Sequence, residues 1–494
     1  MTNDPLNLDE AVEWVGLWWL PDDPGKQIPG ILRYDGEGRS SLSLIGAFEE
    51  GIFSSPAPGV TLYHGRTRTW DVIHGVAEHR EITLLGCVPT RPTRTMFARV
   101  ESPDTQTVSA TIAIIGAHVG GEEDAAFAAA EISVEDLGLL AASSVFGSSL
   151  GTHDGTVNGT GSISVKPVAA QTVTVEGTEY SLVHTHTLPF FDRRKGGTVG
   201  RMRETVHIRV RRAEPFALSV ALDAARLIQD LIALAMHRAA GVIWLRLEIA
   251  GTESFLPDGR CLPRRRVNVL YSPVASGKHD EKGVHPGRVF FTCEELPFEE
   301  VVPRWCKAHR RLRAATNMIL GLRYAPARFI ENNLLTAVGA AEALHRGLDI
   351  DEKPIAEAEF DAIRNAMLEQ VPEEHRARFK AAIRNTLTLR DRLLALAARP
   401  NQDAIMQLVP DVDHWAKRTA RARNDFAHEG RTPNQSIDEL DAIVGATTAV
   451  VILNILHELG LSAERQCQIV REHPQLQTVC QRASEWLVVP EPSS

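Results

Sequence analysis

One stretch near the C-terminus, residues 415–428, reads WAKRTARARNDFAH. It ends a helix that we predict over about residues 412–428, late in a run of helices that fills the last third of the chain. Around this stretch, the sequence divides into a helical C-terminal region and a strand-rich N-terminal region. We therefore expect an α+β protein, in which a β-rich N-terminal region of about residues 1–300 precedes an all-α bundle over about residues 301–494.

Amphipathic segments dominate the chain from about residue 302 to its end. Short loops between such segments are typical of an antiparallel helical bundle. Besides the helix over 412–428, we expect helices over about residues 303–322, 328–346, 356–370, 374–397 and 436–459, with two shorter pieces at the end. The helix from Ser436 starts with Ser436-Ile437-Asp438-Glu439, which fits a capping box, and Gly460 is a natural stop.

The first 300 residues favour strands, because apolar and polar residues alternate in several short runs. Candidate strands lie within residues 30–48, 81–88, 106–117, 171–175, 180–188, 204–212, 242–249, 266–271 and 288–293. A stripe of Leu and Ala predicts one helix over about residues 216–240. Residues 147–164 are rich in Gly, Ser, Thr and Asn and predict a loop, so we expect a division of this region near residues 145–165.

Composition excludes several classes of protein. Apolar residues make up 44% of the 494 residues and charged residues 23%, which is ordinary for a globular chain. The net charge of −10 argues against a protein that coats DNA with its whole surface, although local basic patches remain open. The six cysteines contain no Cys-x-x-Cys pair, so we expect no zinc ribbon and a cytoplasmic location. No run of about 18 uncharged apolar residues predicts a membrane span.

Motifs of three common enzyme classes are missing. The sequence has no phosphate-binding loop, no Gly-x-Gly-x-x-Gly after a strand and no His-Glu-x-x-His. The stretch at 415–428 instead contains Arg423 and, five residues on, His428. RNA cleavage without a metal needs a group that transfers protons near neutral pH, which His supplies, and a fixed cation for the phosphate, which Arg supplies. The spacing alone is not specific, since Arg201 with His207 and Arg304 with His309 are similarly placed.

The sequence around Arg423 and His428 supports their selection as candidate catalytic residues. Arg423-Asn424-Asp425-Phe426-Ala427-His428 resembles the Arg-polar-x3-His ribonuclease motif of HEPN domains, the nucleotide-binding domains of higher eukaryotes and prokaryotes. The upstream segments Phe329–Asn333 and Ala341–Arg346 resemble the helix that opens the ApeA-type HEPN subgroup. The N-terminus resembles the opening of the ApeA N-terminal domain, in the segments 16–21, 29–32 and 42–46.

The resemblance implies defence against bacteriophage in a bacterial cell. An N-terminal sensing region would control a C-terminal HEPN endoribonuclease that cleaves RNA, for example tRNA, and thereby cause abortive infection. It implies Arg423 and His428 as catalytic residues, with Asn424 beside them and Arg421 as a supporting residue. It also implies a homodimer through the HEPN domain, an RNA substrate, an unidentified phage-derived trigger and no cofactor.

One geometric difficulty follows from the helix itself. Residues five apart on a straight helix differ by about 140° in direction, so Arg423 and His428 would not share a face. Either the helix frays near His428 or the active site is composite, with each protomer of a dimer supplying one half. The implied HEPN dimer favours the composite site.

Other charged residues are weaker candidates. Glu342 could orient a motif arginine through a charge-assisted bond, or it could be an ordinary charge on the rim of the bundle. His184 and His186 alternate on a candidate strand and form a possible metal pair without a third ligand. Two basic runs could bind RNA or be solvated surfaces. The first includes Arg304, Lys307, Arg310, Arg311, Arg313, Arg323 and Arg328, and the second Arg193, Arg194, Lys195, Arg201, Arg203, Arg209, Arg211 and Arg212.

Two other functions remain open at this stage. The HEPN bundle could be a non-catalytic module for dimerisation or RNA binding, with the β region as the ligand sensor. Alternatively, the chain could be a β-sandwich binder of carbohydrate or protein with a helical stalk. In the nuclease hypothesis, an acidic N-terminal surface could cover the basic helix near residues 304–328 until a trigger binds.

Overall fold

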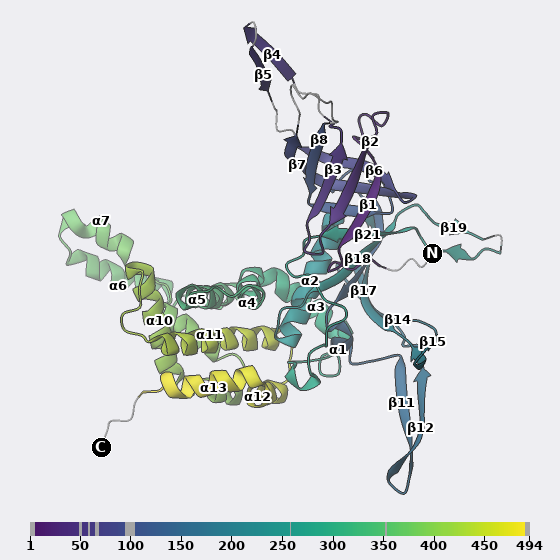
Figure 1. Ribbon diagram of the computed structural model, residues 1–494. Helices are drawn as coiled ribbons and strands as arrows, with labels where there is room; N and C mark the ends of the chain where they lie inside the picture. The colour runs from purple at the N-terminus through teal and green to yellow at the C-terminus, as the bar shows by residue number, and fades with distance from the viewer. Residues whose placement is uncertain are drawn as a thin grey trace. The chain divides into compact units, whose positions relative to one another are not determined.

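The computed structural model describes residues 5–48, 52–57, 60–64, 69–93, 104–256, 258–350 and 353–489. The chain folds into two compact units, of which unit 1 comprises residues 1–284 with 292–294 and unit 2 comprises residues 285–291 with 295–494. Unit 1 is built mainly of strands and unit 2 of helices (Figure 1). The expected α+β fold, with a β-rich N-terminal region and a helical C-terminal bundle, is confirmed.

A closed ring of six strands forms the first part of unit 1. Pairing runs in the order β7-β6-β1-β2-β3-β8, and β8 pairs back onto β7 to close the ring. These strands are β1 (Val12–Trp19), β2 (Ile28–Tyr34), β3 (Ser40–Ile45), β6 (Trp70–Ala77), β7 (Arg80–Thr93) and β8 (Thr105–Ala110). A separate hairpin consists of β4 (Ile52–Ala57) and β5 (Val60–His64).

Alternation along β1 explains how the ring fills its interior. Trp18 is fully buried, whereas the neighbouring Trp19 faces the other side and lies edge-on to the ring of His118, with centroids 5.3 Å apart. Gly75 of β6 is the cross-strand partner of Trp18, and a Cβ atom at Gly75 would lie 2.2 Å from the indole. Only glycine therefore leaves room for the tryptophan that occupies the ring.

The second part of unit 1 is an antiparallel sheet in the order β13-β14-β17-β10-β18-β21-β9. Helix α2 (Leu218–Met236) packs against β10, β17 and β18. The first half of β7 pairs with β9 and its second half with β8, so one continuous strand joins the ring to this sheet. The strands are β9 (Ile112–Ile115), β10 (Phe127–Val134), β13 (Gln171–Val175), β14 (Thr178–His186), β17 (Glu204–Phe216), β18 (Val242–Ile249) and β21 (Arg266–Tyr271).

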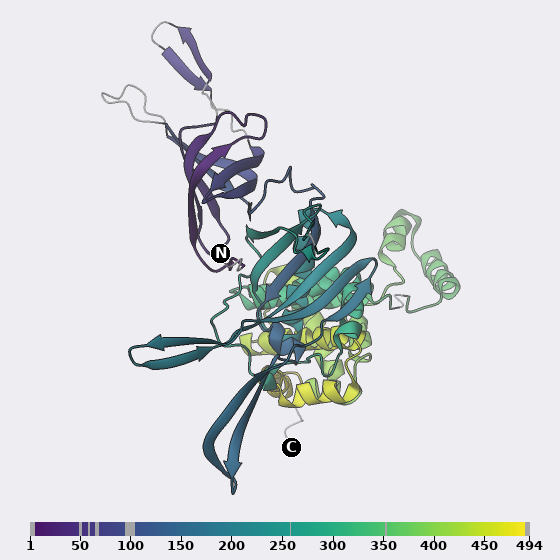
Figure 2. The ribbon, with the colours of Figure 1, turned by 90° about the vertical axis from the view of Figure 1, so that its right-hand side faces the viewer.

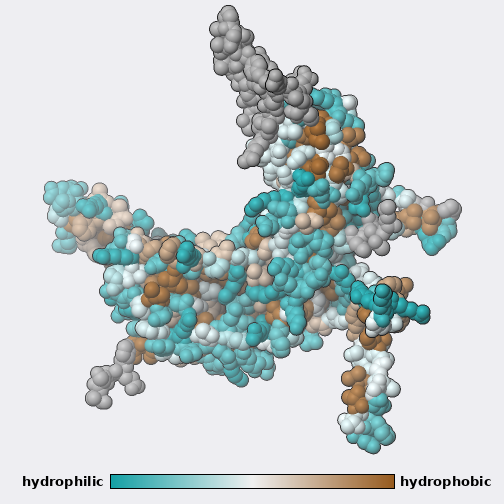
Figure 3. Space-filling view, viewed as in Figure 1, coloured by the Kyte–Doolittle hydropathy of each residue, from teal (hydrophilic) through white to brown (hydrophobic). Residues whose placement is uncertain are grey.

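Two-stranded ribbons extend from this sheet (Figure 2). They are β11 (Phe146–His153) with β12 (Thr156–Val165), and β15 (Phe190–Arg194) with β16 (Gly197–Arg201). The loop expected over residues 147–164 is therefore wrong, because its small polar residues form the first ribbon. Leu150, Val157 and Ile163 of this ribbon are exposed. Figure 3 shows brown, hydrophobic areas along the ribbon at its lower right. A shorter pair, β19 (Ser254–Phe255) with β20 (Cys261–Leu262), completes the strands of unit 1.

The strand expected over residues 288–293 is also wrong. A short 3-10 turn covers Pro286–Arg288, and the next residues are extended without a partner strand. Phe290 and Phe291 are fully buried there, and the Arg465 guanidinium donates to the carbonyl oxygen of Phe290 at 2.9 Å. Apolar burial rather than strand pairing explains the strand-like sequence. One short helix, α1 (Leu137–Ala141), also belongs to unit 1.

Unit 2 contains eleven helices within the part of the chain that the structure describes. The central helix, α11 (Ile437–Glu458), packs against α5 (Ile330–Gly347), α4 (Arg313–Tyr324), α8 (Leu389–Ala397), α10 (Val412–Glu429) and α13 (Pro474–Trp486). The remaining helices are α3 (Phe298–Arg311), α6 (Glu357–Glu369), α7 (Glu373–Ala382), α9 (Gln402–Leu408) and α12 (Ala463–Glu472). Helices α6 and α7 form a hairpin that extends from the others (Figure 1).

Local capping explains why one expected helix is two. The sequence predicted a single helix over 374–397, whereas α7 ends at Ala382 and α8 begins after Thr388. The Thr388 hydroxyl accepts from the backbone N–H of Asp391, and the Asp391 carboxylate accepts from the backbone N–H of Thr388. The Thr388 hydroxyl also donates to this carboxylate at 2.6 Å, and that bond, together with the one from the Thr388 N–H, holds the pKa of Asp391 below its ordinary value. This reciprocal cap starts a new helix.

Helix α11 has the length and composition of a membrane span, with a mean hydropathy of 1.7 in its most apolar window. However, 78% of that window is buried inside the described structure. The apolar residues of α11 are therefore accounted for by its central position in the bundle.

Candidate active site

Helix α10 carries the candidate catalytic residues. The Asp411 side chain caps its first turn by accepting from the backbone N–H of His414 at 2.9 Å. Trp415, Ala416, Thr419 and Ala422 form its buried stripe, which agrees with the helix predicted from the sequence. Gly430, with φ of 68°, is the left-handed residue that ends the helix directly after Glu429.

Two polar contacts fix α10 against α11. The buried Trp415 indole donates to the Thr447 hydroxyl at 3.3 Å. The Arg418 guanidinium binds both carboxylate oxygens of Glu439, one of them at 2.6 Å, and also donates to the carbonyl oxygen of Asn434 at 3.0 Å. We expected Glu439 to complete a capping box, but only the Ser436 half of that box forms, because the Glu439 carboxylate binds Arg418 instead.

Arg423 lies where α10 faces α5. Its Nη2 atom is 3.6 Å from the Glu342 carboxylate, and its Nη1 atom donates to the Asn424 side-chain oxygen at 3.3 Å. The Arg423 side chain is 36% exposed and the Glu342 side chain 25% exposed, so both are within reach of a ligand. The structure therefore brings together Arg423, Asn424 and Glu342, three of the residues selected from the sequence.

His428 lies in the last turn of α10 and is exposed. Within the described residues no hydrogen bond or ion pair involves its ring. The helix runs without interruption through both Arg423 and His428, which disagrees with the less favoured of the two alternatives, a helix that frays near His428. Because residues five apart on a helix point about 140° away from each other, the two side chains do not converge within one protomer.

Two further polar residues surround the motif. The Arg421 guanidinium is 3.8 Å from the Asp425 carboxylate, which also accepts from the Asn434 side-chain amide at 3.1 Å. The sequence selected Arg421 but missed Asp425. The i,i+4 spacing of an arginine and an aspartate on one helix is the signal that could have identified the pair.

Comparisons with known proteins agree with this arrangement. A family model described as ApeA N-terminal domain 1 matches residues 13–305, and a model described as Apea-like HEPN matches residues 335–465. The chain belongs to the ApeA family. Its C-terminal domain is a HEPN domain, a class whose members are generally ribonucleases that commonly bind RNA and dimerise. The two matches make this chain a HEPN nuclease-type antiphage defence protein.

Other comparisons add no argument. No curated protein sequence matches the chain. A solved structure named "pT26-6p" aligns with 97% of this chain and 93% of its own, at 10% identity and a TM-score of 0.14. That score is too low to indicate a shared fold. The HEPN match includes Glu342, Arg421, Arg423, Asn424 and His428.

The basic residues of the first run precede the HEPN match and lie on α3 and α4, except Arg328, which lies between α4 and α5. Arg304 donates to the carbonyl oxygen of Leu459 at 3.0 Å and pairs with Glu300 at 2.8 Å. Arg311 donates to the carbonyl oxygen of Gly347 at 2.6 Å. Lys307, Arg310 and Arg313 are exposed. A role of this surface in RNA binding stays a prediction, and the contacts of Arg304 and Arg311 give those two residues a structural role.

The histidine pair of β14 is not arranged as a metal site. The Nδ1 atom of His184 is 2.7 Å from the Glu204 carboxylate and its Nε2 atom is 3.1 Å from the Ser143 hydroxyl, whereas His186 is exposed. Burial raises the pKa of Glu204, but hydrogen bonds from Ser144, Val145 and His184 together hold it below its ordinary value. His184 therefore has no nitrogen left for a metal ion.

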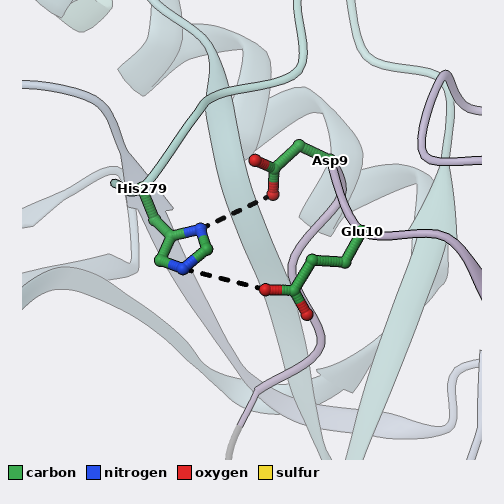
Figure 4. A group of neighbouring side chains, drawn as sticks. All are labelled: Asp9, Glu10 and His279. Carbon is green, nitrogen blue, oxygen red and sulfur yellow. Dashed lines mark ion pairs between the residues drawn. The ribbon is translucent and has the colours of Figure 1, made fainter. Parts of the chain in front are cut away.

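A third cluster, in unit 1, combines Asp9, Glu10 and His279 (Figure 4). The Asp9 carboxylate is 3.7 Å from Nδ1 of His279 and the Glu10 carboxylate is 3.7 Å from Nε2, so each acid lies beside a different nitrogen of the ring. One ligand atom of each residue lies within 4.8 Å of those of the other two, a spacing that could hold a metal ion but that exposed acidic groups also adopt without one. The arrangement is that of a histidine between two acids, which fastens residues 9–10 to the segment around residue 279.

Proposed function

We propose that this protein is a metal-independent endoribonuclease. The observation that carries the proposal is the complete Arg-Asn-x3-His motif on one uninterrupted helix of a HEPN domain. Three features support it. The Glu342 carboxylate lies beside Arg423, and the side chains of Arg423 and Glu342 are both partly exposed. The ring of His428 is exposed and forms no hydrogen bond or ion pair with any described residue.

In the proposed reaction, the 2′-hydroxyl of a ribose attacks the adjacent phosphorus and the bond from phosphorus to the 5′-oxygen breaks. His428 takes the proton of the 2′-hydroxyl and returns a proton to the leaving 5′-oxygen. Arg423 binds the phosphate oxygens as their negative charge increases, and Glu342 positions the Arg423 guanidinium. The products are a 2′,3′-cyclic phosphate and a 5′-hydroxyl end.

We further propose that the active site is composite. Arg423 and His428 point in different directions on one helix, so a two-fold homodimer would pair Arg423 of one protomer with His428 of its partner. Asn424 would contact the same phosphate. In this proposal the region of about residues 1–300 controls the nuclease in the cytoplasm, a phage-derived trigger releases it, and cleavage of RNA such as tRNA stops growth of the infected cell.

Cleavage of total cellular RNA and tRNA in the presence of EDTA tests the reaction. Replacing His428 or Arg423 by Ala should reduce the rate by about 10²-fold or more. His414→Ala is the matched control, because His414 lies on the same helix without a role in the motif. RNA binding without cleavage under every condition, including with phage lysate added, would establish a non-catalytic binding module instead.

Mixing two inactive proteins tests the composite site. A heterodimer of the Arg423→Ala and His428→Ala proteins contains one site with both substitutions and one site with neither, provided that each site draws on both protomers. The heterodimer purified after co-expression should therefore have about half of the wild-type activity. A co-purified heterodimer that stays inactive, while wild-type homodimers cleave, would contradict the composite arrangement.

Removal of residues 1–300 tests whether the N-terminal region inhibits the nuclease. The fragment should cleave faster, or be more toxic on expression, than the full chain. Unchanged activity in a folded fragment would count against inhibition by the N-terminal region.

A further inference from the structure

The β15–β16 ribbon of unit 1 has no role in the proposed reaction. Its two strands pair only with each other within the described residues, in the register Phe190 to Arg201 through Arg194 to Gly197. At its base, the backbone N–H of Thr187 donates to the carbonyl oxygen of Arg203 at 2.9 Å. The backbone N–H of Arg203 donates to the Thr187 hydroxyl at the same distance. Figure 2 shows the ribbon extending away from the sheet.

The net charge of the ribbon is opposite in sign to the net charge of the whole chain. Residues 188–203 hold five cations and one carboxylate, which leaves a net charge of +4, whereas the chain carries −10. The carboxylate of Asp192 pairs with Arg194 at 2.8 Å. The other four cations form no ion pair with any described residue and are Arg193, Lys195, Arg201 and Arg203. Such uncompensated charge on an acidic protein indicates attraction to a polyanion.

Two exposed aromatic rings accompany these cations. Phe191 is 71% exposed and Phe190 is 60% exposed, and as neighbours on a strand they face opposite sides of the ribbon. The ring of Phe191 lies across the backbone of its partner Gly200, 3.2 Å from where a Cβ atom would be. One side of that ring is thus supported, and the missing side chain of Gly200 lets it lie flat.

Each face of the ribbon combines a ring with a cation. Phe191 shares its face with Arg193, two residues further along the strand. Phe190 stands opposite Arg201 on the neighbouring strand, on the other face. Nucleic-acid bases stack on aromatic rings while Arg and Lys bind the phosphates that connect them, and single strands expose both groups.

We propose that the β15–β16 ribbon binds single-stranded nucleic acid, with Phe191 as a stacking platform for a base and Arg193 and Lys195 on the adjoining phosphates. The distribution of apolar groups favours this partner over an anionic membrane. A ribbon that enters a membrane needs an apolar tip, whereas this tip is Arg194-Lys195-Gly196-Gly197 and the rings lie nearer the base. The binding is independent of the chemistry of His428.

Fluorescence anisotropy with labelled single-stranded oligonucleotides tests the proposal on the full chain. An oligodeoxynucleotide has no 2′-hydroxyl to react, and an oligoribonucleotide is measured in the His428→Ala background, so cleavage does not affect either arm. Phe191→Ala should weaken binding by at least about fivefold. Phe379→Ala, which removes an exposed phenylalanine of α7, should leave the affinity unchanged.

The salt dependence separates the two kinds of contact. Arg193→Ala and Lys195→Ala should each lower the slope of log affinity against log salt by about 0.7, whereas Phe191→Ala should leave the slope unchanged. Arg260→Ala, at an exposed arginine of unit 1, is the matched control for charge. Equal affinities of the wild-type and Phe191→Ala proteins would overturn the proposal. So would ribbon-dependent binding to phosphatidylserine vesicles without any ribbon-dependent binding to oligonucleotides.

Discussion

Acidification should destabilise unit 1 through one buried histidine. His207 of β17 is 4% exposed, and its ring lies 5.7 Å from the ring of Trp244. Burial lowers the pKa of His207 to about 4, and the neighbouring Arg246, Arg209 and Arg266 act in the same direction against the attraction of Glu131. The folded state therefore holds this imidazole neutral, whereas the unfolded chain protonates it with a pKa near 6.5.

The sign and the size of the effect follow from that difference. A group whose pKa is lower in the folded state contributes full stability above its unfolded pKa and loses it as the pH falls. The loss begins near pH 6.5 and ends near pH 4, and linkage gives about 2 kcal/mol between pH 7 and pH 5. The acids whose pKa values are lowered, such as Glu131, titrate mainly below this window.

Urea unfolding at pH 7 and at pH 5 measures this loss. The unfolding of unit 1 is monitored by the amide-exchange protection of peptides from β17. His74 and His473 also have pKa values lowered chiefly by burial, so the wild-type loss contains other contributions. The comparison that isolates His207 is therefore with His207→Gln, which cannot be protonated. The variant should lose about 2 kcal/mol less than the wild type over this range. Equal pH dependence of the two proteins would refute the assignment of His207 as a buried neutral group.

Three further perturbations test the packing around the candidate site and in the ring of six strands. Arg418→Ala should lower the free energy of unfolding of unit 2 by about 2–4 kcal/mol, because it leaves the Glu439 carboxylate buried without its partner. Arg421→Ala, which removes an exposed ion pair, should change that free energy by less than about 0.5 kcal/mol. Equal urea midpoints for the two variants would contradict a stabilising role of the Arg418–Glu439 contact. Trp415→Phe should cost about 1–2 kcal/mol by leaving Thr447 without its donor, and an unchanged melting temperature would show that this hydrogen bond is dispensable. Gly75→Ala should destabilise unit 1 by about 1–3 kcal/mol because its Cβ would overlap Trp18, and a variant with wild-type stability would mean that the indole can move aside.

The sequence predicted elements well where apolar periodicity was strong. The strands Val242–Ile249 and Arg266–Tyr271 have the predicted bounds, because runs of Val, Leu and Ile are buried in the sheet. The ribbon β11–β12 was missed because its Gly, Ser and Thr residues bury nothing, and backbone pairing with a Ser149–Ser162 hydroxyl hydrogen bond holds its strands together instead. The break before α8 was missed because a Thr-x-x-Asp cap is a four-residue signal inside a long helical pattern.

The candidate site shows a different limit of sequence analysis. Arg423, Asn424 and His428 could be selected from one stretch of chain, since they lie within six residues. That Glu342 lies beside Arg423 depends on how α5 packs against α10, and local sequence does not determine this packing. The carboxylate of Glu439 was assigned to the wrong partner for the same reason, because Arg418 is nearby only in three dimensions.

The continuous strand β7 has a consequence for how this protein can be rearranged by recombination. Its second half closes the ring of strands, while its first half pairs with β9, which follows the ring in the sequence. A gene fragment that ends after β8 would therefore encode a ring whose longest strand has an unpaired edge, and a fragment that begins at β9 would encode a sheet without its outermost partner. Residues 13–305 are matched as one family domain, which agrees with inheritance of the ring and the sheet as a single piece. Exchange between relatives should preserve both together and occur near the start of the helical unit.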